Sequence, residues 1–123
     1  MLNNYSGTLP ATESEFFLGK IYFDEGDLSK ASKHLENFNS HGENSLLLAA
    51  SARMLASIEV ENGNVTNAIN IIKKAINKTS LVNQKNSLIL DEVNLLILNG
   101  SIDDARKTID KVCLLYTSPS PRD

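Results

Sequence analysis

A short motif recurs three times along the chain, and its even spacing constrains the fold more than any other feature. Gly26, Gly63 and Gly100 are 37 residues apart, and each is followed five residues later by an alanine. A small polar residue and an aliphatic residue come directly after each glycine, and further apolar residues come four and seven positions after each alanine. Self-similarity at a fixed period of this length is typical of chains built from stacked copies of one small structural unit.

Each part of the motif has a physical role at a turn between two helices. Glycine suits the left-handed conformation at the end of a helix, because it has no Cβ. The residues that follow, Asp27, Asn64 and Ser101, are of the types preferred as helix N-caps. Apolar residues three or four positions apart then form one buried stripe on an amphipathic helix. We therefore predict that one helix ends at each glycine and that a second begins one residue later.

This pattern predicts six helices. Those before each glycine are expected at Phe16–Glu25, with a start as early as Thr8 or Thr12, at Ser45–Asn62 and at Leu81–Asn99. The last helix is expected at Ile102–Val112. Three helix-turn-helix units result, so the predicted fold is all-α, an α-solenoid of three repeats with a period of 37 residues. On the last helix, Ile102, Ile109 and Val112 are expected to be partly exposed, because this helix lacks the polar cap that a terminal repeat needs.

The last part of the chain, Cys113–Asp123, interrupts the helical pattern with a segment rich in serine and proline. Its sequence, CLLYTSPSPRD, resembles the translation of an adapter used in preparing sequencing libraries. We therefore interpret residues 113–123 as a non-native disordered tail, residues 12–112 as the repeat domain and residues 1–11 as a leading segment. The native product is then expected to continue past Val112, which makes this chain a fragment whose single cysteine is not native.

The first unit carries a fuller motif on both sides of its glycine. It reads Leu18-Gly19-x-x-Tyr22-x-x-x-Gly26-Asp27-x-x-x-Ala31-x-x-x-Leu35-x-x-Phe38. This pattern resembles the tetratricopeptide repeat, and the resemblance extends over about residues 12–112. The second unit departs from it at Glu59, where the aromatic residue belongs, and the third departs from it at Val93 and Leu96. The resemblance implies helix pairs whose first helices line a concave groove for another polypeptide.

A narrower resemblance rests on the residues before and within the first helix. Asn4-Tyr5-Ser6-Gly7-Thr8, followed by Glu15-Phe16-Phe17-Leu18-Gly19, is similar to bacterial cell-envelope tetratricopeptide proteins. The ancillary subunit of the SecYEG translocon and lipoproteins of outer-membrane assembly are examples. Such a family implies a membrane-anchored N-terminal part missing from this chain, a place at the periplasmic face of the envelope and a role in escorting or organising envelope proteins. Without that resemblance, a cytoplasmic location is expected.

Composition and charge argue against several classes of function. A nucleic-acid binder needs clustered Lys and Arg, whereas the net charge is −3 and the pair Lys73-Lys74 is too short to supply a patch. His34 and His41 lack a second ligand at metal-binding spacing. Asp91-Glu92 are adjacent on a helix and do not face each other, so we interpret them as solvated surface. We expect no enzymatic activity, metal, cofactor, nucleic acid or small-molecule substrate, and membrane contact only through a missing anchor.

What remains is a surface for another protein or peptide segment. In the tetratricopeptide register, the groove would be lined by Phe16, Lys20 and Phe23, by Arg53, Ser57 and Val60, and by Leu90, Asn94 and Ile97. Apolar residues beside Lys and Arg suit an amphipathic or extended polypeptide, although the same apolar side chains could instead pack between units. Two roles stay open: a protein-interaction scaffold, and a structural spacer or self-association segment of a larger protein. A regulatory domain of an enzyme is a third option.

Overall fold

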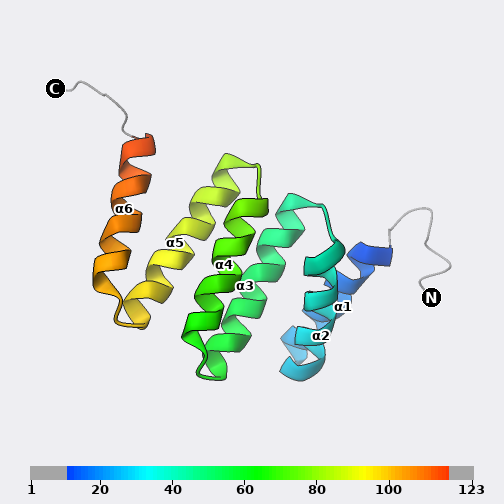
Figure 1. Cartoon of the computed structure of the whole chain (residues 1–123). Coiled ribbons are helices and arrows are strands. Elements are labelled where there is room, and N and C mark those ends of the chain that lie inside the picture. The colour runs from blue at the N-terminus through cyan, green and yellow to red at the C-terminus, as the bar shows by residue number, and fades with distance from the viewer. Residues whose placement is uncertain (1–10, 117–123) are drawn as a thin grey trace.

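Six α-helices make up the computed structural model, which describes residues 11–116. They are α1 (Ala11–Glu25), α2 (Leu28–His41), α3 (Ser45–Glu61), α4 (Val65–Lys78), α5 (Val82–Leu98) and α6 (Ile102–Tyr116), and no strand occurs within these residues. Figure 1 shows them side by side in a row that starts with α1 and α2 and ends with α6. None of these six helices is long and apolar enough to cross a membrane. The prediction of an all-α fold is confirmed.

The largest difference from the predicted helix boundaries is at the end of α6. α1 begins at Ala11, between the two predicted starts, but α6 continues to Tyr116, four residues into the segment that we interpreted as a tail. Residues 113–116 contain no glycine or proline, so nothing in their sequence stops the helix from adding further turns. Residues 1–10 and 117–123 lie outside the described residues, and with them most of the leading segment and of the tail.

The helices form two layers. α3 contacts both α1 and α5, so the odd-numbered helices form one layer. Each even-numbered helix packs against its neighbours in the chain, and α2 and α4 lie in front of α1 and α3 in Figure 1. We call the surface of α1, α3 and α5 the odd-helix face, and the surface of α2, α4 and α6 the even-helix face.

The turn within each helix pair has the same geometry. Gly26, Gly63 and Gly100 have φ values of 87°, 84° and 81°. In each turn the amide of the residue after the glycine donates to a carbonyl five residues earlier; the first example is Asp27 N to Tyr22 O at 2.9 Å. This is the Schellman arrangement, which satisfies carbonyl groups at the end of a helix. The prediction that a glycine in the left-handed region ends each first helix is confirmed.

The N-caps that follow the glycines differ from one another. Asp27 caps α2 as predicted, because its Oδ1 accepts a hydrogen bond from the Lys30 amide at 3.3 Å. Asn64 makes no such bond at the start of α4, so the prediction is wrong there. Its Nδ2 instead donates to Oε1 of Glu59 across the turn at 3.2 Å. Ser101 Oγ accepts a hydrogen bond from Asn99 Nδ2 at 3.1 Å.

The apolar stripe of α2 is buried between α1 and α3. Ala31, Leu35 and Phe38 have no exposed surface and belong to one cluster with residues of α1 and α3. Gly19 on α1 lies against this stripe, and a Cβ at that position would lie 2.7 Å from the Leu35 side chain. The small residue of the motif is therefore needed for the close approach of α1 and α2.

The corresponding stripes of α4 and α6 show decreasing burial. Ala68, Ile72 and Ala75 on α4 are all buried. On α6 only Ala105 is buried, whereas Ile102 and Ile109 are 43% and 42% exposed. Val112 is partly exposed as well. The prediction that the apolar residues of the last helix are partly exposed is confirmed.

Candidate functional site

A cavity of about 400 Å³ opens on the odd-helix face between α3 and α5, and it brings together four of the nine predicted site residues. Arg53, Ser57 and Val60 come from α3, and Asn94 comes from α5. Ala56 and Glu61 of α3, Ile72 of α4, and Asp91 and Leu95 of α5 complete the lining. We call this the α3–α5 cavity. Its residues come from three helices because the Ile72 side chain of α4 reaches the space between the two odd-numbered helices.

The floor of the α3–α5 cavity is apolar. Ile72 is almost fully buried and Ala56 is buried, while Val60 and Leu95 are partly exposed and pack against the same core cluster. Ser57 and Asn94 are exposed polar residues at the rim. An apolar floor with a few polar groups around it is the usual composition of a site that holds an apolar group of a ligand.

Arg53 links α3 to α5 through two hydrogen bonds. Its Nε donates to Oδ2 of Asp91 at 2.6 Å, and its Nη2 donates to Oγ of Ser87. Asp91 and Ser87 are four residues apart, so they lie on the same side of α5 and face the guanidinium together. The Arg53 and Asp91 side chains are each a little over one third exposed, and they form a charged pair at the edge of the cavity.

The charge of this site differs from the prediction. We expected an apolar and cationic surface, but the positive charge of Arg53 is matched by Asp91. Glu61 adds a second carboxylate, so the lining of the α3–α5 cavity carries a net charge of −1. The other predicted cation, Lys20, is exposed on α1 and pairs with Asp24 at 3.1 Å.

Phe16 lies in the core and not on the groove surface where we predicted it. It is 4% exposed and packs in the first core cluster, where its ring centroid lies 5.5 Å from that of Phe38. Because α2 covers this side of α1, the ring is part of the core instead of the groove surface. Phe23 is partly buried and packs against the same cluster. The alternative that apolar side chains of the first unit pack between helices therefore holds for Phe16.

The two remaining predicted residues lie on α5 outside the cavity lining. Leu90 is 60% exposed and Ile97 is 51% exposed. They flank Asn94 at helical spacing, so they share one side of α5 with that residue of the cavity. They are exposed apolar groups beside the α3–α5 cavity.

Sequence reasoning missed the acidic partner of Arg53. We interpreted Asp91-Glu92 as solvated surface, yet Asp91 pairs with Arg53 and Glu92 is only 8% exposed. Glu92 Oε2 lies 3.9 Å from Nζ of Lys73 on α4. The Asp91 carboxylate thus lies on the odd-helix face, whereas the Glu92 carboxylate lies toward α4.

His34 also has a partner that the sequence did not reveal. Its Nδ1 lies 2.6 Å from Oε1 of Glu15, and its ring stacks on Tyr22 at a centroid distance of 5.5 Å. The side chain is about one quarter exposed and connects α2 to α1. In the described part of the chain, no group of three or more His, Cys, Asp or Glu residues is placed to hold a metal ion.

The comparison with protein families agrees with this architecture. The sequence profile of the tetratricopeptide repeat-like domain matches residues 1–111. The chain belongs to this family. The match includes all of α1 to α5 and most of α6, so the three glycine turns and the α3–α5 cavity all lie within it. No curated protein and no solved structure matches the chain significantly. Tetratricopeptide repeat-like domains are in general protein-interaction domains without catalysis, and the protein fits that broad role.

Proposed function

We propose that the protein is a non-enzymatic interaction scaffold that binds a polypeptide segment along its odd-helix face. The observation that carries this proposal is the α3–α5 cavity, with its apolar floor and its rim of Ser57, Asn94 and the Arg53–Asp91 pair. An apolar side chain of the partner would occupy the cavity, and its backbone would bond to the polar rim. Leu90 and Ile97 add exposed apolar area beside it.

We further propose that the six helices are a segment of an α-solenoid with a period of 37 residues. The repeated positive φ at Gly26, Gly63 and Gly100 supports this, because each helix pair then turns in the same way. The contacts of α3 with both α1 and α5 also support it, because an inner layer of touching helices forms the concave side of a curved array. The groove of such an array would run over the α3–α5 cavity.

A second role is favoured by one observation at the end of the row. Leu98, Ile102 and Ile109 on α5 and α6 are 60%, 43% and 42% exposed. A helical repeat normally covers such residues with the next unit. The alternative role is therefore a structural spacer, in which this end stacks on a further repeat of a larger protein or on a second copy.

We also propose that the protein acts in a bacterial cell envelope. This proposal rests on the resemblance of Tyr5-Ser6-Gly7-Thr8 to envelope tetratricopeptide proteins, and these residues lie outside the described range. An envelope location would make exported or outer-membrane polypeptides the partners, with attachment to the membrane through a part outside this chain.

The experiment that tests the scaffold role is site-specific photocrosslinking in the source cell. A benzoylphenylalanine residue at Ser57 reports on the cavity rim, and one at Asn37, an exposed residue on α2 that does not line the cavity, serves as the control position. We expect Ser57 to crosslink a defined set of polypeptides that Asn37 does not.

A second variant pair separates cavity binding from general apolar contact. Val60→Asp places a carboxylate in the cavity, whereas Val82→Asp changes a valine that is 66% exposed at the start of α5. We expect the crosslinks at Ser57 to disappear in the Val60 variant and to persist in the Val82 variant, with both proteins folded by circular dichroism. Equal crosslinks in both variants would reject the cavity as the binding site. If none form in the unmodified background, the spacer role is the better account.

A further inference from the structure

The two layers of helices carry opposite charge. α2, α4 and α6 contain eight Lys and Arg residues against four Asp and Glu residues, a net charge of +4. α1, α3 and α5 contain three basic residues against eight acidic ones, a net charge of −5. α4 contributes most to this difference, because it contains Lys73, Lys74 and Lys78 and no acidic residue. The overall charge of −3 therefore conceals a basic even-helix face.

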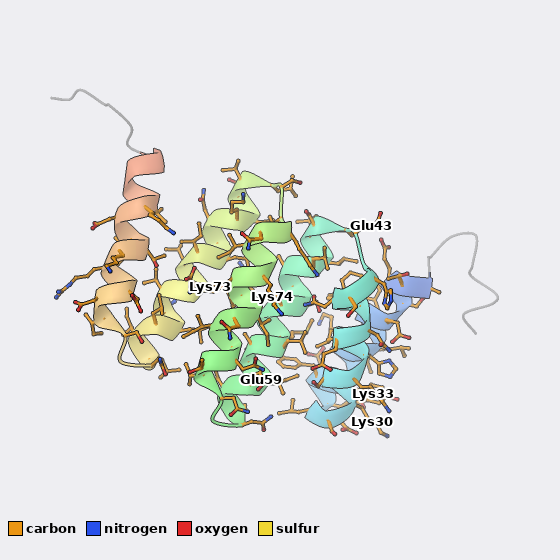
Figure 2. All side chains as sticks on the ribbon, viewed as in Figure 1. Lys30, Lys33, Glu43, Glu59, Lys73 and Lys74 are labelled. Atoms are coloured by element: carbon orange, nitrogen blue, oxygen red, sulfur yellow. The ribbon has the colours of Figure 1, made fainter. Side chains whose placement is uncertain are left out.

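Two cavities lie on the even-helix face, and α4 forms a wall of both. The α2–α4 cavity measures about 400 Å³ and is lined by Lys74, Lys78 and one carboxylate, that of Glu36. The α4–α6 cavity measures about 540 Å³ and is lined by Lys73, Lys107 and Lys111 with the carboxylates of Glu92 and Asp104. Figure 2 shows Lys73 on the α5 side of α4 and Lys74 on the α3 side. Each cavity carries a net charge of +1, opposite in sign to the α3–α5 cavity.

Several of these lysines have no partner in the described part of the chain. Lys74, Lys107 and Lys111 are exposed and make no ion pair or hydrogen bond there. Lys73 is the cation nearest to the buried Glu92, and Lys78 Nζ donates to the carbonyl oxygen of Asn39 at 2.9 Å. Each of the two cavities thus has at least one lysine ammonium group without a partner among the described residues.

The cavity floors are apolar. Leu48 and Leu55 of α3 and Ile71 of α4 lie beneath the α2–α4 cavity, and Ile76 and Leu96 lie beneath the α4–α6 cavity. A ligand that fits both the floors and the rims needs apolar groups and negative charges at short intervals. A polypeptide segment with alternating acidic and apolar side chains has this chemistry.

We propose that the even-helix face is a second binding surface, and that its ligand is an acidic polypeptide segment with apolar residues among its carboxylates. This surface is separate from the α3–α5 cavity and does not depend on the function proposed for that cavity. A flat bilayer would contact the outer surfaces of the helices and leave the hollows between them empty. The evenly spaced phosphates of a nucleic acid would meet Asp103, Asp104 and Asp110 of α6, whereas the carboxylates of a polypeptide can be spaced to avoid them.

A direct test is fluorescence anisotropy with two synthetic peptides of about fifteen residues. In the first peptide Glu and Leu alternate, and Ser occupies the remaining positions. The second peptide has Gln in place of every Glu. Because exposed charge pairs are weak singly and add up in number, we expect the Glu peptide to bind about tenfold more tightly at low salt. That difference is expected to shrink as salt is added, since salt screens exposed charges.

Matched double variants locate the site on the surface. Lys74→Gln/Lys107→Gln removes one unpaired lysine from each of the two cavities, and Lys20→Gln/Lys85→Gln removes the two lysines of the odd-numbered helices. Both variants lose the same charge. We expect about fivefold weaker binding of the Glu peptide for the first and less than about twofold change for the second. Val60→Asp, in the α3–α5 cavity, is expected to leave this binding unchanged.

Carbodiimide crosslinking of the Glu peptide to the unmodified protein provides a measurement that needs no variant. Crosslinks are expected at Lys73, Lys74, Lys107 and Lys111. The proposal is overturned if neither peptide binds, if the two peptides bind equally, or if the two double variants lose affinity equally. It is also overturned if phosphatidylglycerol vesicles or a single-stranded oligonucleotide bind to the same lysines more tightly than the Glu peptide does.

Discussion

The first and third helix pairs carry the same motif, but they bury it to different extents. Leu35 on α2 has no exposed surface, whereas Ile109 at the equivalent place on α6 is 42% exposed. α2 packs extensively against both α1 and α3, while α6 packs extensively against α5 only, among the described helices. The motif therefore determines which side chains face inward, and the number of neighbouring helices determines how much area they bury. Stability in such an array depends on the interfaces between units as well as on each unit itself.

The largest expected effect comes from truncating the two equivalent aliphatic residues. Leu35→Ala leaves a cavity in the fully buried cluster of α1, α2 and α3, so we expect it to lower the free energy of unfolding by about 2–5 kcal/mol. Ile109→Ala removes a half-exposed side chain, and we expect a loss below about 1 kcal/mol. Urea denaturation of both variants measures the difference. Equal losses would mean that α6 is covered in solution, by a second copy or by residues outside the described range.

Enlarging the two equivalent alanines tests the same comparison with a smaller effect. Ala68 has no exposed surface at the contact of α4 with its neighbours, so Ala68→Leu is expected to cost about 1–3 kcal/mol through overpacking. Ala105 is 2% exposed, but α6 has a neighbour on one side only and can move outward to make room. We therefore expect Ala105→Leu to cost less than Ala68→Leu in the same denaturation assay. A larger loss for Ala105→Leu than for Ala68→Leu would show that the contact of α5 with α6 is more rigid than the contacts of α4 with its neighbours.

Replacing the glycine is expected to cost the same free energy of unfolding in the second turn as in the third. Gly63 and Gly100 have nearly the same positive φ, and no atom lies within 4 Å of where a Cβ would be placed at either. The cost of Gly63→Ala and of Gly100→Ala then comes from the left-handed backbone alone, and it is about 1 kcal/mol for each. Thermal denaturation of the two variants checks this equality. A cost at Gly63 well above that at Gly100 would mean that the turn contributes to packing between units.

Local features of the fold could be predicted from the sequence, because they are encoded within a few residues. A glycine followed by a small polar residue was sufficient to place all three turns, and the spacing of Ala31, Leu35 and Phe38 identified the buried stripe of α2. The end of α6 was less predictable. The serine- and proline-rich composition begins only after Tyr116, so the adapter-like sequence before it remains compatible with a helix.

The candidate site was only partly predictable, because it depends on contacts between distant residues. The register predicted one groove surface for Arg53, Ser57, Val60 and Asn94, and the structure places these four at one cavity. It could not reveal that Arg53 pairs with Asp91, since no local pattern specifies which side chain of the next unit a long arginine reaches. It also placed Phe16 on the groove surface, because the periodicity of α1 does not show which of its sides α2 covers.

The smallest expected effect concerns the end of the row, and it tests the interpretation of residues 113–123. Deleting Cys113–Asp123 shortens α6 by four residues, at a helix end where hydrogen bonds open most readily. We expect the free energy of unfolding to change by less than about 0.5 kcal/mol and the helical circular dichroism signal to fall only slightly. A deletion that starts at Ala105 is the control, because it also removes a buried contact with α5 and is expected to cost clearly more. If removing residues 113–123 alone cost more than about 1 kcal/mol, that segment would be packed against the repeats, and its exclusion from the repeat domain would be wrong.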